Sequence, residues 1–429
     1  MATYPTEVTG DLTGIAFPVS VDTLKAAGPA FLTRAFQKVG AIGPDNAVTE
    51  ITGWTEFFGG GMGRKIKLDV CYAKPEPGLT GQLFAKFTRE FGDPLRELFS
   101  PVMGPEVRFA LLSRRDGFPV TVPTCFFADY NAQEKTGLLI TARVPYGEEG
   151  VEPALDKCLD YTLDDPLEHY QAQTQAMAAL AAYHRAGHFG DEIERQFPFD
   201  RAAFASTRLI PYTAEQLAEK LDILKRFAAD APQLLPPELS TPAFLDAFAQ
   251  GALLVQEKEL AILEHLADQD DLIALCHWNM NPDNAWFWRD ADGTLRSGQL
   301  DWGGVCQMNL AQSFFGMTCA AETEFLARHE ANLAQQLLAE YEGHGGPRVD
   351  FDRFMTSVKL SMAVLGTAWM LDAPSLIAAE IADYTALEDR FDPGIRDLFI
   401  PRAQLQLMTV FLDGWRRLDI GAAVRALPS

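Results

Sequence analysis

The hydrophobic periodicity of the sequence changes near residue 150, and this change limits the folds that the chain can adopt. Before that point, after one helical segment, apolar and polar residues mostly alternate, which is typical of half-buried strands. After it, apolar residues recur at helical spacing in most segments. The pattern predicts an α+β chain, with an antiparallel sheet in a first lobe and a larger helical lobe behind it. A length of 429 residues fits two or three units of roughly 150 residues.

The first lobe is predicted to begin with a helix from about residue 21 to 39, for which Ser20 is a suitable N-cap. A strand, a glycine-rich turn at 59–63 and a second strand follow, since Ile66, Leu68 and Val70 alternate with polar residues. Further strands are predicted at 83–87, 124–129 and 136–144, and a helix at 105–112.

The second lobe is predicted to be helical, with one interruption. Its expected helices are 171–185, 214–229, 243–267, 310–341 and 351–381. The longest strongly apolar run, 360–371, has twelve residues, which is too short to span a bilayer and indicates a core helix. The interruption, 272–302, has a strand-like entry, a polar loop, an apolar strand and an Asp-Gly turn that predicts a hairpin.

Charge excludes one class of partner. The chain has 36 Lys+Arg against 59 Asp+Glu, a net charge of −23, so phosphate backbones and anionic membranes should repel it. The acidic excess suits a solvated surface, a cationic substrate, or both. The six cysteines form no CxxC pair and have no zinc-finger spacing, which favours free thiols in a reducing compartment. The N-terminus lacks the pattern of a signal peptide, so we expect a soluble, cytoplasmic protein.

The polar loop of the interruption has the spacing of a kinase-like catalytic loop. It begins at His277, has the polar residue Asn279 two positions later and Asn284 five positions after that, and Asp301 ends the following hairpin. Magnesium prefers hard oxygen ligands, and an Asn carbonyl and a carboxylate at the two ends of a hairpin provide them. This arrangement favours binding of Mg²⁺ beside the phosphates of ATP.

The order of these motifs resembles the aminoglycoside phosphotransferase/choline kinase-like superfamily and, within it, the ecdysteroid-kinase-like branch. The family's loop is roughly His-Gly-Asp-x-x-x-x-Asn, followed by a hairpin and Ile-Asp-Trp. The corresponding segments are His277-Trp278-Asn279-x-x-x-x-Asn284 and Leu300-Asp301-Trp302. The resemblance covers roughly residues 20 to 390, and it implies a two-lobed protein-kinase-like α+β fold that binds ATP and Mg²⁺.

The resemblance also implies roles for single residues. Lys86 would bind the α/β-phosphates and Glu106 would pair with it, while His277 would brace the loop. Asn284 and Asp301 would hold the metal ion. The glycines that would cover the nucleotide are Gly60, Gly61 and Gly63. Taken singly, these signals are weaker, because a glycine run is usually a turn and a lone strand lysine is more often solvated.

The division implied by the family is a nucleotide-binding lobe at 1–145 and a helical lobe at 146–429 that carries the hairpin 272–302. The hinge backbone is expected within 140–144, and 200–260 would form a helical insert on the substrate side. On a chain of charge −23, an ATP site must gather positive charge through Mg²⁺, Lys86 and either Arg64 or Lys65.

Three positions depart from the family pattern. Asn279 occupies the position of the catalytic aspartate, Trp278 that of a glycine, and Asn309 that of a second acid. A neutral amide can orient a hydroxyl but cannot take its proton. Asp283 is the nearest other carboxylate. The sequence therefore favours an ATP- and Mg²⁺-dependent phosphotransferase of weakened activity, with Asn279 and Asp301 in the catalytic positions.

Two alternatives to this function stay open: a nucleotide-binding pseudokinase with a binding or regulatory role, and an enzyme that transfers AMP. The acceptor of the phosphotransferase would be a small neutral or cationic alcohol.

Overall fold

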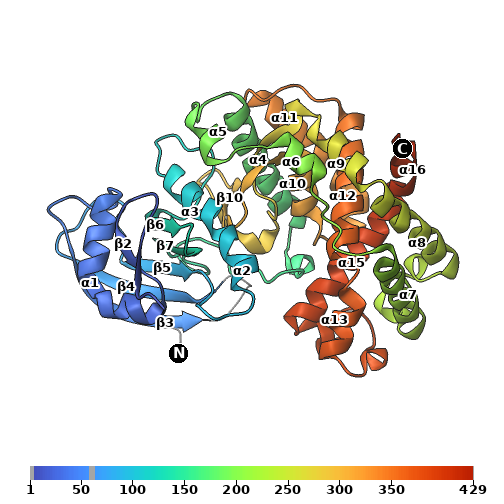
Figure 1. Cartoon of the computed structure of the whole chain (residues 1–429), viewed down its shortest axis with the longest axis horizontal. Helices are drawn as coiled ribbons and strands as arrows, with labels where there is room; N and C mark the ends of the chain where they lie inside the picture. The colour runs from blue at the N-terminus through green and yellow to red at the C-terminus, as the bar shows by residue number, and fades with distance from the viewer. Residues whose placement is uncertain (1–3, 58–62, 429) are drawn as a thin grey trace. The chain divides into compact units, whose positions relative to one another are not determined.

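A computed structural model describes residues 4–57 and 63–428 of the chain. The contacts between residues divide it into two compact units (Figure 1). The N-terminal unit comprises Met1–Pro153 and the later segment Gly298–Val305, and the C-terminal unit comprises the remaining residues. The predicted α+β class is confirmed, because an antiparallel sheet is followed by a mainly helical region. The predicted domain limits, 1–145 and 146–429, stay a prediction.

The N-terminal unit is built on a five-stranded antiparallel sheet. Its strand order is β3-β4-β5-β7-β6, in which every neighbouring pair is antiparallel. The strands are β3 (Val48–Phe57), β4 (Lys65–Tyr72), β5 (Gln82–Phe87), β6 (Cys125–Asn131) and β7 (Thr136–Ala142). The sequence did not predict a separate small hairpin, β1 (Glu7–Thr9) with β2 (Ala16–Pro18). The buried Asp129 holds the turn of this hairpin by accepting hydrogen bonds from the backbone N–H groups of Leu12 and Thr13, both at 3.0 Å.

Helix α1 (Val21–Lys38) covers one face of the sheet. It begins where the sequence predicts, because Ser20 and Thr23 form a reciprocal capping box. Its apolar side chains, among them Phe31 and Phe36, are buried against side chains of the strands such as Leu83. The core of the unit therefore lies between α1 and this face.

The opposite face of the sheet is packed against α3 (Met103–Leu112), which follows α2 (Arg96–Phe99) and a 3-10 turn (Ser100–Val102). A second, smaller apolar cluster joins Met103 and Val107 of this helix to Leu139 of β7. The sheet thus separates two layers: α1 on one side and α3 on the other.

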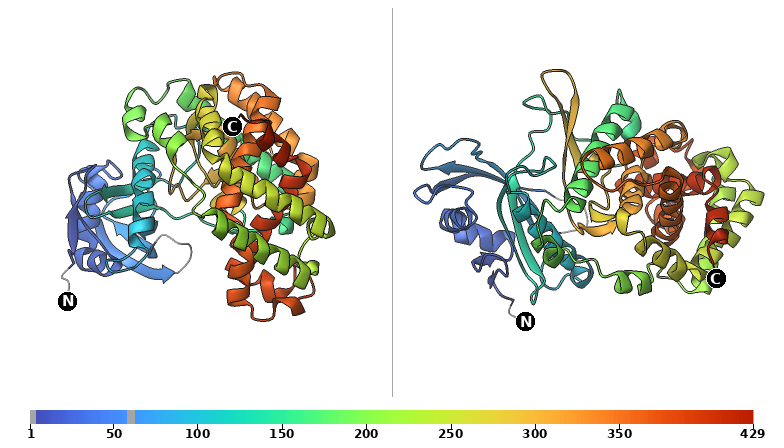
Figure 2. Two further views of the ribbon diagram at one scale, coloured as in Figure 1. Left: turned by 45° about the vertical axis from the view of Figure 1, so that its right-hand side comes forward. Right: turned by 90° about the horizontal axis from the view of Figure 1, so that it is seen from above.

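The C-terminal unit is mainly helical. Its helices are α4 (Pro166–Arg185), α5 (Glu192–Gln196), α6 (Arg201–Ser206), α7 (Ala214–Asp230), α8 (Pro242–Glu257), α9 (Glu259–Ala267), α10 (Leu310–Thr318), α11 (Thr323–Gly343), α12 (Phe351–Trp369), α13 (Ala373–Glu380), α14 (Pro393–Arg396), α15 (Phe399–Arg417) and α16 (Ile420–Ala426). Strand β8 (Ile273–Cys276) pairs with β11 (Cys306–Asn309), and β9 (Ala285–Arg289) pairs with β10 (Leu295–Gln299). Figure 2 shows β9 and β10 as a narrow two-stranded projection.

Three long helices predicted from the sequence are each two helices. The segment predicted as 243–267 breaks at Lys258, which is the C-cap of α8 and the N-cap of α9. The segment 310–341 breaks at 319–322, where Glu322 has an extended backbone. The segment 351–381 breaks before Pro374, which cannot donate a backbone hydrogen bond. Hydrophobic spacing continues across each break because both halves have buried faces.

The segment Phe351–Glu380 is long and apolar enough to cross a membrane by length and composition alone, and 61% of its most apolar stretch is buried inside the folded chain. It comprises α12 and α13, which are separated by a turn at 370–372. Such burial is expected of a core helix.

Candidate functional site

Lys86 lies on the face of the sheet that packs against α3. Its neighbours on β5, Ala85 and Phe87, point into the core beneath α1, so the alternation of a strand turns Lys86 to the other side. The side chain is buried, with 3% of the residue exposed. A lysine at this depth requires compensating negative charge.

Two carboxylates supply that charge. The Nζ of Lys86 lies 2.9 Å from both carboxylate oxygens of Glu106, in the first turn of α3, and 2.7 Å from Oδ1 of Asp301. Glu106 is as deeply buried as Lys86, with 4% exposed. Burial alone would lower the pKa of Lys86, but the two carboxylates outweigh it and hold the pKa above its usual range. The lysine is therefore charged at neutral pH.

A distant segment brings Asp301 to this lysine. Gly298 forms a parallel bridge with Thr121, and the N–H of Gly304 donates to the carbonyl oxygen of Val102 at 3.1 Å. Between them, Trp302 stacks on Phe109 of α3, with ring centroids 3.9 Å apart. These contacts make residues 298–305 part of the N-terminal unit.

The backbone of Asp301 has a φ of 54°, in the left-handed region. A non-glycine residue there costs about 1 kcal/mol, and such strain is concentrated at functional sites. The side chain is 47% exposed while Oδ1 contacts Lys86. Asp301 can therefore meet a ligand that enters from solvent.

The glycine-rich turn is partly described. Gly60 and Gly61 lie outside the described residues. Gly63 has a φ of 133°, and a Cβ at this position would lie 2.3 Å from the carbonyl oxygen of Phe87, so only glycine fits. Gly63 thus allows the backbone before β4 to approach the end of β5 closely.

The neighbouring cations differ in their surroundings. Arg64 pairs with Glu56 and, at 2.7 Å, with Glu90, so its charge is already balanced. Lys65 is the residue directly opposite Lys86 in the β4–β5 register, which places both lysines on one face. Burial and the charge of Lys86 lower the pKa of Lys65. Of the two candidates from the sequence, Lys65 is the one beside Lys86.

The polar loop lies in the C-terminal unit, after β8. His277 is buried, its Nδ1 accepts from the N–H of Asn279 at 3.0 Å, and its carbonyl oxygen accepts from Ser313 Oγ at 2.7 Å. Asn284 Nδ2 donates to the carbonyl oxygen of Asn279 at 2.8 Å. His277 and Asn284 thus hold the main chain of Asn279 from both sides.

Two residues that sequence reasoning missed support the loop. The amide of Asn281 donates to the carbonyl oxygens of Gly316 and Met317, and its Oδ1 accepts from Lys157 Nζ at 2.7 Å. Lys157 also lies 3.4 Å from Asp283, so the carboxylate nearest to Asn279 in sequence is an ion-pair partner. Asn281 could have been chosen as a polar residue inside the motif, whereas no local pattern marks Lys157.

Trp278 and Asn309, two of the three positions that depart from the expected motif, make contacts within the fold. Trp278 is 41% exposed, and its ring meets that of Trp369 edge to face at 6.1 Å. Asn309 is fully buried and caps α10, because its Oδ1 accepts from Ala311 N–H and its Nδ2 donates to the carbonyl oxygen of Leu266, both at 3.0 Å. Both ends of the Asn309 amide are therefore used within the fold.

The structure brings the candidate residues together in two groups. Lys86, Glu106 and Asp301 meet in the N-terminal unit, and His277, Asn279 and Asn284 meet in the C-terminal unit. Because Asn284 and Asp301 belong to different units, their joint binding of Mg²⁺ stays a prediction.

The donor chemistry of this pair suits the ion. The amide nitrogen of Asn284 is used in a hydrogen bond, which leaves Oδ1 as its ligand atom, and Asp301 adds a carboxylate. Among the described residues there is no cluster of three or more His, Cys, Asp and Glu that could hold a metal alone. A metal at Asn284 and Asp301 would therefore need water or substrate oxygens to complete its shell.

No family model matches the chain, and no curated protein matches it. Among solved structures, the chain is similar to a choline/ethanolamine kinase family protein from Mesorhizobium loti, with 14% identity, 91% of this chain and 98% of that chain covered, and a TM-score of 0.41. A Plasmodium vivax ethanolamine kinase has 10% identity, coverage of 85% and 83%, and a TM-score of 0.43. An aminoglycoside 2'-phosphotransferase in complex with GDP has 14% identity, coverage of 80% and 90%, and a TM-score of 0.40.

Proposed function

We propose that the protein transfers a phosphoryl group from Mg²⁺-bound ATP to a hydroxyl of a small molecule. The observation that carries the proposal is the buried ion pair of Lys86 and Glu106 together with Asp301. A buried charged pair usually stabilises a fold no better than apolar residues of the same volume would. Its presence beside a strained, half-exposed carboxylate favours a site for a polyphosphate and a cation.

Each residue of this group has a distinct role. Lys86, fixed by Glu106, contacts the α- and β-phosphates, and Lys65 adds a second cation on the same face of the sheet. Asp301 and Asn284 supply oxygen ligands for Mg²⁺, whose charge offsets that of the phosphates. Gly60, Gly61 and Gly63 cover the nucleotide, as the sequence pattern predicts.

Asn279 orients the acceptor hydroxyl. Its main chain is held by His277 and Asn284, which supports a defined position for its side chain, and the resemblance assigns that position to a carboxylate in the family. The amide oxygen can accept a hydrogen bond from the hydroxyl, but it cannot remove the proton. General-base help is worth roughly 10²–10⁴-fold, so the expected activity is slow and depends on positioning.

A nucleotide-binding pseudokinase is the second candidate. The neutral Asn279 favours it, and so does Asn309, which is used as a helix cap and cannot act as a second acid. Under this alternative, Mg²⁺ and ATP bind without transfer. A third candidate, transfer of AMP, differs in its product, which would carry an adenylyl group.

The proposal extends to partners and location. The acceptor is a small neutral or cationic alcohol, because the net charge of −23 disfavours anionic partners. The same charge argues against nucleic acid and membrane surfaces as partners, and the free cysteines fit the cytoplasm.

The test compares Asn279→Asp with the natural sequence. Both proteins are assayed for ATP turnover with a panel of alcohols, and for a rise in melting temperature with Mg²⁺ and ATP. If restoring the carboxylate raises turnover by about 10² or more, the loop is a phosphoryl-transfer site that lacks its base. Equal turnover would show that Asn279 does not occupy the base position.

Binding is controlled separately. Lys86→Met should abolish the rise in melting temperature with Mg²⁺ and ATP. Lys67→Met should keep it; Lys67 is on β4, two residues after Lys65 and on the same face of the sheet. If the natural protein shows no rise at all, the proposal fails as a whole, including its pseudokinase form.

A further inference from the structure

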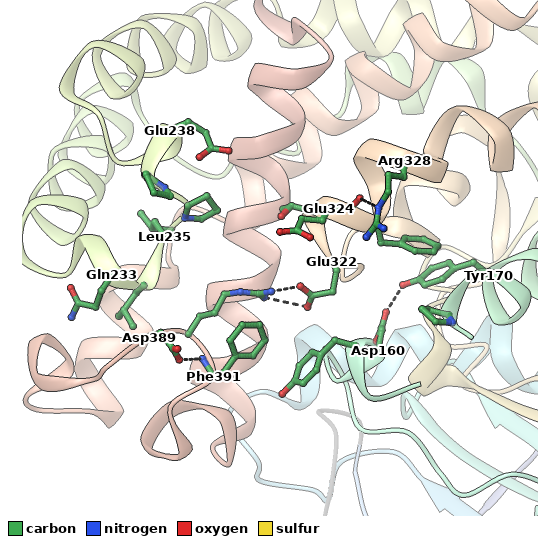
Figure 3. A pocket seen from close by; sticks show the side chains of 18 residues that line it. Asp160, Tyr170, Gln233, Leu235, Glu238, Glu322, Glu324, Arg328, Asp389 and Phe391 are labelled. Atoms are coloured by element: carbon green, nitrogen blue, oxygen red, sulfur yellow. Dashed lines mark hydrogen bonds and ion pairs between the residues drawn. The ribbon is translucent and has the colours of Figure 1, made fainter. Parts of the chain in front are cut away.

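The C-terminal unit contains a cavity of about 660 Å³ (Figure 3). Its wall is formed by the 3-10 turn Asp160–Thr162, the start of α4, the turns at 232–239, the start of α11 and residues 389–391. The volume is in the range of cavities that hold small organic ligands. No residue of its wall belongs to the loop 277–284 or to the group at Lys86.

The wall of this cavity is negatively charged. Five carboxylates face two guanidinium groups: Asp160, Glu238, Glu322, Glu324 and Asp389 against Arg328 and Arg390. Arg390 is engaged, since it pairs with Glu322 and donates to Gln406 Oε1 at 2.8 Å. Arg328 donates to the backbone oxygen of Glu324 at 3.0 Å. Glu238 lies 3.5 Å from Arg416, which leaves Asp160, Glu324 and Asp389 without an ion-pair partner among the described residues. Their charge favours a cationic occupant.

Aromatic rings complete the wall. Tyr161, Tyr170, Phe325 and Phe391 line the cavity beside the acids. The faces of aromatic rings attract cations, with about 0.5–2 kcal/mol for each well-placed ring. An acidic cavity with aromatic walls suits an organic cation better than a hydrated metal ion.

Asp160 carries a buried oxygen atom that a ligand in this cavity could satisfy. Only 3% of it is exposed, its Oδ2 accepts a hydrogen bond from Tyr170, and its Oδ1 has no hydrogen-bond partner among the described residues. A buried carboxylate oxygen without a donor costs about 1–3 kcal/mol. A ligand that brings an N–H group to this oxygen removes that cost.

The charges around Asp160 support this reading. Burial raises its pKa to about 7; the hydrogen bond from Tyr170 and the charge of Lys157 oppose the rise, and Asp283 and Glu322 add to it. A positive group in the cavity would shift the balance to the ionised form, so that binding near neutral pH releases a proton.

We propose that this cavity binds a small organic cation with an N–H donor, a primary amine or a guanidinium, and that Asp160 is its anchoring carboxylate. The site is separate from the proposed phosphotransferase and needs no nucleotide. Its test therefore stands whether or not phosphoryl transfer is found.

The experiment is isothermal titration calorimetry on the full chain at 150 mM NaCl, with 1,4-diaminobutane and spermidine as probes and 1,4-butanediol as the neutral control. We expect saturable binding of the amines and none of the diol. Asp160→Asn, which keeps an acceptor for Tyr170, should weaken amine binding at least tenfold. Glu324→Gln, at an exposed position of the wall, should weaken it about threefold and should change the melting temperature little.

Two further measurements separate this site from adsorption to an acidic protein. Glu219→Gln, an exposed acid of α7 outside the cavity, should leave binding unchanged. At pH 7, the measured heat should differ between Tris and phosphate buffers because a proton is released, and Asp160→Asn should remove that difference. Binding that Asp160→Asn leaves unchanged, or that Glu219→Gln weakens equally, would overturn the proposal.

Discussion

At the scale of single residues, replacing Lys86 should cost a large part of the free energy of unfolding. Lys86→Met leaves Glu106 buried without a cation, and breaking such a pair by removing one partner costs about 3–5 kcal/mol. We expect this loss in urea unfolding at pH 7. Lys135→Met, which removes an exposed pair with Glu97, should cost less than about 0.5 kcal/mol.

The pH dependence of that variant follows from Glu106. Without Lys86, burial and the charge of Asp301 raise the pKa of Glu106 against only the weaker opposing effect of Lys65, so the folded state favours the protonated acid. Stability is then greatest at low pH and falls as the pH rises through that pKa. At pH 5, Lys86→Met should therefore recover part of the lost free energy of unfolding. The double variant Lys86→Met/Glu106→Gln should recover part of it already at pH 7. A loss that neither change reduces would contradict the pairing.

Asp160 predicts a second pH dependence. Its pKa is about 7 in the folded chain and 3.8 for an unburied aspartate, so folding takes up a proton at pH values between 3.8 and about 7. The group contributes no penalty below pH 3.8, and stability falls as the pH rises to about 7. Asp160→Asn should lessen this fall, by up to about 4 kcal/mol between pH 4 and pH 8. Thermal unfolding of both proteins across this range measures it, and parallel curves would contradict it.

The sequence identified the residues that belong to an ordered motif. Lys86, Glu106 and Asp301 lie far apart in the chain, yet each is found from its place in the motif order, and the structure brings them together. Lys157 and Asp160 have no such pattern. The hydrogen bond of Lys157 to Asn281 joins residues more than a hundred positions apart, and the cavity beside Asp160 is completed by the distant segments 322–328 and 389–391. Local spacing shows neither.

At the scale of elements, α10 approaches the polar loop closely at Gly316. A Cβ on Gly316 would lie 1.8 Å from the carbonyl oxygen of Trp278, which is backbone and cannot turn away. Gly316→Ala should therefore displace the loop and lower stability by about 2 kcal/mol or more. Gly343→Ala, at the end of α11 with open space around it, should be neutral or slightly stabilising. Chemical unfolding measures both, and equal effects would contradict the tight contact.

The elements themselves were predictable to different degrees. Strand β4 follows from alternation, and α1 from its cap, because these signals are local. The break between α8 and α9 at Lys258 was not predictable, because no proline or glycine marks it and the apolar spacing continues across it. Helix α15 was also missed, although its buried face follows a regular pattern.

At the scale of the whole molecule, the N-terminal unit is not one continuous piece of chain. Residues 298–305 contact α3 through the stacking of Trp302 on Phe109 and the hydrogen bond of Gly304 to Val102. A fragment of residues 1–153 lacks these contacts. We expect the amides of α3 to exchange with solvent faster in the fragment than in the full chain.

Helix α1 is an internal control for that experiment, because it packs on the opposite face of the sheet. Its amides should differ much less between fragment and full chain. Hydrogen exchange followed by mass spectrometry measures both helices in one sample. Equal protection of α3 in the two proteins would show that residues 298–305 do not stabilise it.

The discontinuous unit also restricts how this gene can be divided. A cut after residue 153 gives one product that holds Lys86 and Glu106 and a second that holds Asp301. Neither product alone carries the complete group, so neither can be inherited or transplanted as a working module. The two halves, produced together, should show the rise in melting temperature with Mg²⁺ and ATP only when they associate. That rise would then report the association of the two fragments.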